Sequence, residues 1–153
     1  MADRAAMQQA PHDSDELVAR ALEARRNAYA PYSRFAVGAA VRASDGRIFA
    51  GANVENASYG LAICAERNAV AQAVSAGARE LVELAVATQT SPPSAPCGMC
   101  RQTLAEFARD LPITLVNEAG ERSRTTLGAL LPQAFRGEDL ARAPGGGDGD
   151  RRG

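Results

Sequence analysis

Apolar residues recur along the chain with two different periods, and these periods separate predicted helices from predicted strands. Between 14 and 29 they return every three or four positions, which predicts an amphipathic helix. From 35 to 41 they fit a period of two, which predicts a strand. An Asp-Gly pair at 45–46 predicts a turn, so the apolar residues at 48–49 return the chain as the second strand of a β-hairpin.

The second half of the chain repeats an alternation of helix and strand. Helical spacing extends from 64 to 76, and the nearly unbroken apolar run at 81–88 predicts a strand that is buried on both faces. A shorter helix is predicted over 98–108, followed by a strand at 113–116. Because helices and strands alternate in this way, we expect an α/β fold, a three-layer α/β/α sandwich.

The length of 153 residues fits one domain, which we place at 14–140. Residues 1–13 show no clear periodicity, and residues 141–153 are rich in glycine and charged side chains. Both segments are expected to be flexible.

Charge and hydropathy narrow the classes of function. The formal net charge of −1 leaves no extended basic surface for a phosphate backbone, so a polynucleotide is a poor substrate candidate. The N-terminal segment lacks the apolar run of a signal peptide, and no stretch approaches the roughly 20 apolar residues that span a bilayer. We therefore expect a cytoplasmic protein without membrane contact.

The three cysteines are the strongest chemical signal. Cys97 and Cys100 have C-x-x-C spacing at the start of one predicted helix, and Cys64 begins another. The intervening crossover is expected to bring both helix N-termini to the same edge of the sheet. Three thiolates hold zinc and leave its fourth tetrahedral position open, as in catalytic sites. The single histidine, His12, lies in the N-terminal segment and is not a candidate ligand.

Two side chains beside Cys64 suit catalysis. Three thiolates make the cluster formally negative, which weakens the activation of water by zinc. Helix N-termini and the guanidinium of Arg67 would offset this charge from behind the ligands. Glu66 is two residues past Cys64, where its carboxylate would lie near the metal without binding it and would transfer protons.

Five segments together resemble the small class of cytidine deaminases with three cysteine zinc ligands. They are APYSRFAVGAAV at 30–41, NVENASYG at 53–60, CAERNA at 64–69, PCGMCRQ at 96–102 and LLPQAF at 130–135. The resemblance covers residues 15–140 and implies a mixed five-stranded sheet and one zinc ion per chain. It also implies hydrolytic deamination of cytidine and deoxycytidine to uridine and deoxyuridine in pyrimidine salvage.

The resemblance also implies roles for individual residues. Asn53 and Glu55 would hydrogen-bond the ribose hydroxyls, and Ala65 would contact the substrate. Phe35 would pack against the pyrimidine, although it also fits the inward face of the predicted strand. Phe135 would enter the pocket of a neighbouring subunit, so that a homotetramer shares its active sites.

The sequence departs from the family pattern at one position, and two alternative functions are compatible with it. Gln133 stands where the family commonly has glycine, which affects the placement of Phe135. A deaminase of another small aminopyrimidine, such as blasticidin S, would have the same zinc ligands, but the NVEN segment favours nucleosides. A non-catalytic module with a structural zinc is the alternative from another class.

Overall fold

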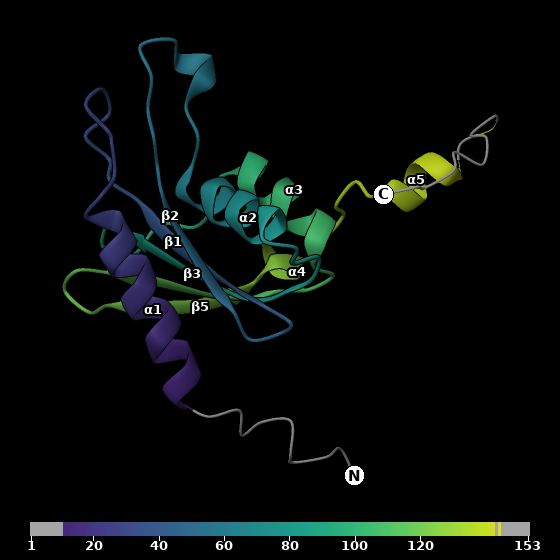
Figure 1. Cartoon of the computed structure of the whole chain (residues 1–153), viewed down its shortest axis with the longest axis horizontal. Coiled ribbons are helices and arrows are strands. Elements are labelled where there is room, and N and C mark those ends of the chain that lie inside the picture. Colours follow the sequence, from purple (N-terminus) through teal and green to yellow (C-terminus); the bar gives the residue numbers. More distant parts are fainter. Residues whose placement is uncertain (1–10, 143, 145–153) are drawn as a thin grey trace.

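The computed structural model describes residues 11–142 and 144, and its centre is a mixed five-stranded sheet (Figure 1). The strands are β1 (Gly38–Ala43), β2 (Ile48–Ala52), β3 (Leu81–Thr88), β4 (Pro112–Asn117) and β5 (Arg122–Thr126). Their order is β2-β1-β3-β4-β5, with β3 and β4 parallel and the other neighbouring pairs antiparallel.

Helices cover both faces of the sheet, which confirms the predicted three-layer α/β/α sandwich (Figure 1). They are α1 (Pro11–Arg25), the 3-10 turn η2 (Tyr59–Leu61), α2 (Ala65–Ser75), α3 (Gly98–Phe107), α4 (Leu127–Leu130) and α5 (Gly137–Ala141). The apolar side of α1 packs on one face through Leu17, Val18 and Ala21. The larger core lies on the opposite face, beneath α2 and α3.

Small residues let the helices lie close to the sheet. A Cβ atom added to Gly38 would lie 2.0 Å from the carbonyl oxygen of Ala21 in α1. One added to Gly51 would lie 2.7 Å from the amide nitrogen of Ala69 and 2.8 Å from the carbonyl oxygen of Ala65, both in α2. These distances are too short for any side chain, so glycine is required where β1 meets α1 and where β2 meets α2.

The connection β3–α3–β4 explains how two distant cysteine segments meet. β3 and β4 run parallel, with Leu84 paired to Ile113 and Thr88 paired to Asn117. The carboxyl end of β3 leads to Cys97, which precedes the first residue of α3, and Cys64 holds the same position before α2. Both helices therefore begin at one edge of the sheet, as the sequence predicted.

The first helix and the first strand differ from their predicted boundaries. The helix predicted over 14–29 begins at Pro11 and ends at Arg25, because the following turns tighten and the amide of Tyr29 then donates to the carbonyl of Asn53. The strand predicted from 35 begins only at Gly38. The side chain of Asn53 bonds the backbone of Phe35 and Val37, where a strand partner would otherwise do so.

The hydrophobic pattern did not predict three elements near the carboxyl end. β5 has the sequence RSRTT and forms an edge strand whose first residues are exposed, so it has little apolar periodicity. α4 and α5 have only four and five residues. The fifth strand was expected from the family resemblance alone.

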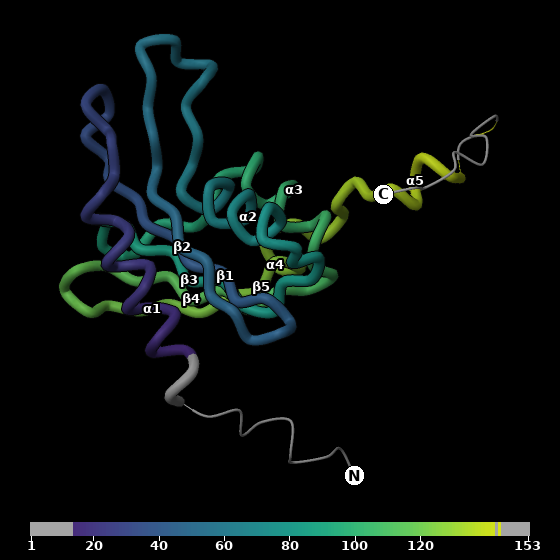
Figure 2. The backbone as a smooth tube through the Cα atoms, in the orientation of Figure 1, coloured from purple at the N-terminus to yellow at the C-terminus, as the bar shows by residue number. Residues whose placement is uncertain are grey.

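The segments after α1 and after β2 project from the same end of the sheet (Figure 2). Isolated bridges connect Tyr29 with Val54 and Val54 with Ile63, so these segments lie side by side. The predicted flexible segments 1–13 and 141–153 lie mostly outside the described residues, and the domain boundaries stay predictions. Within the described part of the chain, no helix is both long enough and apolar enough to cross a membrane.

Candidate metal centre and active site

The three cysteine sulfurs form a compact cluster at the N-termini of α2 and α3. All three Sγ atoms lie within 4.8 Å of one another. Cys64 Sγ is 3.7 Å from Cys97 Sγ, and Cys97 Sγ is 3.4 Å from Cys100 Sγ. Tetrahedral zinc with Zn–S bonds of about 2.3 Å would separate two sulfurs by about 3.8 Å. The donor type and the spacing therefore fit a zinc ion, and these residues are positioned to bind one.

The protonation of the thiols also suits a metal site. The Cys64 thiol accepts a hydrogen bond from Cys100, which lowers the pKa of Cys64 to about 5, and Arg67 contributes in the same direction. The hydrogen bond to Cys64 and burial raise the pKa of Cys100. One sulfur is thus anionic near neutral pH, and a divalent cation would displace the remaining thiol protons.

Glu66 lies in the first turn of α2 and is only 4% exposed. Burial raises the pKa of its carboxyl group, and the negative charge of Cys64 acts in the same direction. Its own backbone amide, the Cys100 thiol and Arg67 oppose the shift. A raised pKa makes the carboxylate a stronger base, which suits a general acid–base residue.

Arg67 lies behind the cysteine cluster with part of its guanidinium unsatisfied. One terminal nitrogen donates to the carbonyl of Ala62 at 3.0 Å, while the buried Nε has no hydrogen-bond partner among the described residues. A buried donor without a partner is costly, and an anionic sulfur is a suitable acceptor. The placement agrees with the predicted position of Arg67 beside the ligands.

A cavity of about 220 Å³ opens beside the cysteine cluster. Its walls come from the carboxyl end of β3, the first turn of α2 and the loops before β1 and before α3. The lining residues are Phe35, Val37, Asn53, Cys64, Ala65, Glu66, Val86, Thr88, Ser94, Ala95 and Cys97. The structure therefore brings together two of the cysteines, Glu66 and three of the residues expected to contact substrate.

The two residues expected to hold ribose lie in adjoining hollows. Asn53 borders the cavity, where its Nδ2 donates to the Phe35 carbonyl and its Oδ1 accepts from the Val37 amide. Glu55 lines a neighbouring hollow of about 300 Å³ and accepts hydrogen bonds from the amides of Tyr32 and Ser33 and from the Ser33 hydroxyl. The bonds from Ser33 lower the pKa of the Glu55 carboxyl group.

Phe135 was expected in a neighbour's pocket and lies outside the cavity of its own chain, whereas Thr88 and Ser94 line that cavity and were not expected from the sequence. Phe135 is 58% exposed and is not among the described residues that line the cavity of its own chain. Thr88 and Ser94 do line it, and the Thr88 hydroxyl accepts a hydrogen bond from the Ser94 amide. Thr88 ends a parallel strand, the place where open α/β sheets bind ligands, and this position was the available signal.

Comparisons with known proteins identify the family. Residues 11–131 match the model of the cytidine and deoxycytidylate deaminase zinc-binding region. Cytidine deaminase of Sporosarcina psychrophila is 48% identical over 132 residues, covering 86% of this chain and 97% of that protein. Cytidine deaminase of Halalkalibacterium halodurans is 48% identical over 129 residues, covering 84% and 98%.

A solved structure agrees with the sequence matches. The crystal structure of cytidine deaminase from Burkholderia pseudomallei matches this chain with a TM-score of 0.76 and 48% sequence identity. The match covers 79% of this chain and 98% of the Burkholderia chain. This chain is therefore an enzyme of the cytidine and deoxycytidylate deaminase family, with a zinc-binding deaminase domain.

Proposed function

We propose that the chain catalyses the hydrolytic deamination of cytidine and deoxycytidine, releasing ammonia and forming uridine and deoxyuridine. The observation that carries this proposal is the buried Glu66 carboxyl group beside three clustered cysteine sulfurs at the wall of a small cavity. Catalytic zinc sites use three protein ligands, and this arrangement adds a proton-transfer group next to them.

Cys64, Cys97 and Cys100 would hold one zinc ion per chain. Zinc in this position supplies the Lewis acidity that activates water for attack on the base. Arg67 would donate from Nε to a cysteine sulfur and reduce the negative charge of the thiolates. We expect Arg67→Gln to lose zinc to a chelator faster than the exposed control Arg20→Gln does. Equal rates of zinc loss in the two variants would remove Arg67 from this role.

Glu66 would move the protons of the reaction. Its carboxylate accepts one proton from the attacking water and delivers it to the ring nitrogen; it then accepts the remaining proton of the added hydroxyl and delivers it to the amine, which leaves as ammonia. The raised pKa supports this assignment, because it makes the carboxylate a stronger base and so a better acceptor of the proton from water.

The substrate contacts can be assigned from the hydrogen-bonding capacity that remains at each residue. The Asn53 amide has one N–H and one lone pair left after its two bonds to the backbone. The Glu55 carboxylate accepts three bonds and keeps one acceptor site, enough for a ribose hydroxyl. Phe35 would pack against the pyrimidine, and Ala65 would offer its backbone N–H, which has no partner within α2.

The assembly would be a homotetramer in which neighbouring chains share active sites. Exposed apolar side chains support an interface on the projecting segments: Tyr29, Tyr32, Val54, Tyr59, Leu61 and Ile63. The rings of Tyr32 and Tyr59 already pack edge to face, 5.8 Å apart. Phe135 is exposed on its own chain, and we propose that it closes a neighbour's pocket.

The biological setting follows from the family resemblance. A deaminase of free nucleosides would serve pyrimidine salvage in the cytoplasm. A polynucleotide substrate is disfavoured by the net charge of −1.

The activity can be tested directly with purified protein. The ultraviolet absorbance of cytidine is followed with and without prior treatment with a strong zinc chelator. We expect conversion to uridine by the untreated protein, loss of conversion after chelation, and recovery when zinc is returned. A zinc-loaded, folded protein that leaves both cytidine and deoxycytidine unchanged would contradict the proposed function.

A further inference from the structure

The carboxyl-terminal arm, defined here as residues 131–142, extends away from the body of the molecule beyond α3 and α4 (Figure 1). None of the five residues of α5 is buried, and Leu140 is 62% exposed. A hollow of about 600 Å³ separates part of the arm from the end of α3 and the start of β3. Leu131 and Ala134 pack against the core at the start of the arm, but apolar packing does not reach α5, so another interaction must hold this helix.

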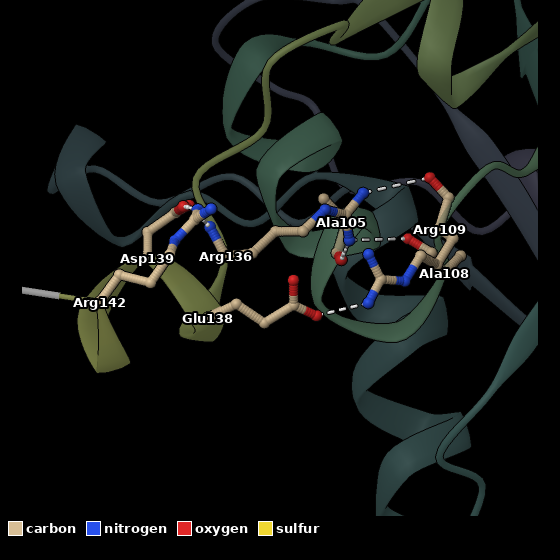
Figure 3. A network of polar contacts seen from close by, with 7 residues as sticks. All are labelled: Ala105, Ala108, Arg109, Arg136, Glu138, Asp139 and Arg142. Carbon is tan, nitrogen blue, oxygen red and sulfur yellow. Dashed lines mark hydrogen bonds and ion pairs between the residues drawn. The ribbon is translucent and has the colours of Figure 1, made fainter.

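Arg136 provides that interaction through its guanidinium group (Figure 3). Nη1 donates to the carbonyls of Ala105 and Ala108, at 2.6 and 3.3 Å, and Nη2 donates to the carbonyl of Arg109 at 3.1 Å. These carbonyls lie at and just beyond the end of α3, where helical partners are missing and the helix dipole is negative. Charge-assisted bonds at such a position are stronger than neutral ones.

Two further bonds hold the arm, and the last residue of α4 just before it, to α3, the helix that carries Cys100. Gln102 Nε2 donates to the carbonyl of Phe135 at 2.7 Å, and Arg101 Nη1 donates to the carbonyl of Leu130 at 3.0 Å. Both donors directly follow Cys100. Two contacts therefore hold the backbone around Phe135 against α3. Gln102 bonds the Phe135 carbonyl, and the next residue, Arg136, bonds the carbonyls at the end of α3.

Within the arm, Asp139 Oδ2 accepts a hydrogen bond from the Arg136 backbone amide at 2.8 Å, and two ion pairs add to this contact. Arg109 pairs with Glu138, and Arg142 pairs with Asp139 (Figure 3). Exposed pairs of this kind contribute little to stability because water screens them. Arg136 differs from them because it joins the arm to three backbone carbonyls of another element.

We propose that Arg136 is a positioning residue: by capping the end of α3, it fixes the arm so that Phe135 projects from its own chain toward a neighbour's pocket. This role rests on the shared-site deaminase proposed above. Loss of Arg136 would affect substrate binding more than proton transfer, because Phe135 would cover the base without touching the protons that Glu66 moves.

The test compares Arg136→Met, which keeps most of the aliphatic stem, with the matched control Arg142→Met in the same arm. Both are made in the full-length, zinc-loaded protein. Hydrogen exchange is measured over residues 131–142, and steady-state kinetics are measured with cytidine. For Arg136→Met we expect arm exchange on the order of tenfold faster and a KM raised on the order of tenfold, with kcat changed less and zinc retained. Arg142→Met should match the wild type in all four measurements.

Two outcomes would overturn the inference: unchanged arm exchange in Arg136→Met, or faster exchange with unchanged KM. Arg136→Lys should recover part of both effects, because an ammonium group donates to fewer of the carbonyls. If Arg136→Met does not fold, Gln102→Leu removes the bond to the Phe135 carbonyl, and an unchanged KM in that variant is equally contrary. A wild-type protein without deaminase activity would remove the positioning role, but arm exchange would still report the cap itself.

Discussion

The chemistry of Glu66 depends on its place in the first turn of α2. The residue is buried by the sheet, and it follows a cysteine whose thiol is already easily ionised. Burial alone would favour a neutral carboxylic acid, while the N-terminus of α2 and Arg67 favour the carboxylate. The net effect is a raised pKa for a carboxyl group that lies two residues from Cys64.

Replacing Glu66 with glutamine tests this role, because the amide has nearly the same shape but cannot take up a proton. We expect Glu66→Gln to keep its zinc and its fold and to lose turnover by about a hundredfold to ten-thousandfold. The measurement is kcat with cytidine alongside zinc content, with the exposed Glu106→Gln as control. Activity within about tenfold of the wild type would assign proton transfer to another group.

The cysteine cluster makes a separate prediction about metal retention. Removing one of three sulfurs leaves two ligands, too few to close a zinc site, and metal binding of this kind is coupled to folding. We expect Cys97→Ala to retain less than about a tenth of a zinc ion per chain and to melt at a lower temperature. Met99→Ala, which removes an exposed sulfur two residues away, should keep its zinc. A full zinc complement in Cys97→Ala by elemental analysis would show that the ligand set is wrong.

At the scale of elements, the sequence predicted the helices and strands whose own hydrophobic pattern specifies their structure. β3 occupies the predicted range 81–88. Its eight residues are mostly apolar, and such a run is stable where both faces of the strand are buried, at the centre of the sheet. α2 and α3 differ from their predicted ranges by one residue or less at each end. β5 could not be found in this way, because an exposed edge strand is specified by the backbone of β4 and not by its own side chains.

The same distinction applies to the site. The clustering of Cys64, Cys97 and Cys100 and the position of Glu66 beside them could be predicted, because their spacing is local to two helix starts. Thr88 and Ser94 join the cavity through the tertiary fold, so their local sequence carries little signal. Phe35 lies outside β1 because Asn53, eighteen residues away, donates a hydrogen bond to its carbonyl. The spacing of hydrophobic residues cannot predict such a contact.

The contact between β2 and α2 yields a prediction for Gly51. A methyl group at this position would press on the backbone of Ala65 and Ala69, so α2 must shift and move the neighbouring Glu66. We expect Gly51→Ala to lower the free energy of unfolding by about 1–3 kcal/mol and to reduce kcat. Gly60→Ala is the control, because a Cβ atom there meets nothing within 4 Å. Chemical denaturation and kinetics that do not distinguish the two variants would show that the contact is looser than the structure has it.

At the scale of the whole molecule, two features of the surface support the proposed association of several copies. Apolar side chains stand exposed on the projecting segments, and the arm holds Phe135 away from its own cavity. A monomer would leave both features in water. Association of several copies would bury the exposed apolar side chains and give Phe135 a neighbour's pocket to enter. Because such a site would combine residues from two chains, mixing variants can test it.

The experiment combines Glu66→Gln chains, which lack the proton-transfer group but have Phe135, with Phe135→Ala chains, which have the reverse. When subunits exchange, some mixed sites contain Glu66 from one chain and Phe135 from its neighbour. We expect activity above the weighted mean of the two parents, because those sites are complete. Native mass spectrometry must show the exchange independently, and Phe135→Ala must be impaired alone. Under those conditions, activity at the weighted mean would mean that both residues serve the same chain, and a monomer by light scattering would contradict the shared site before any mixing.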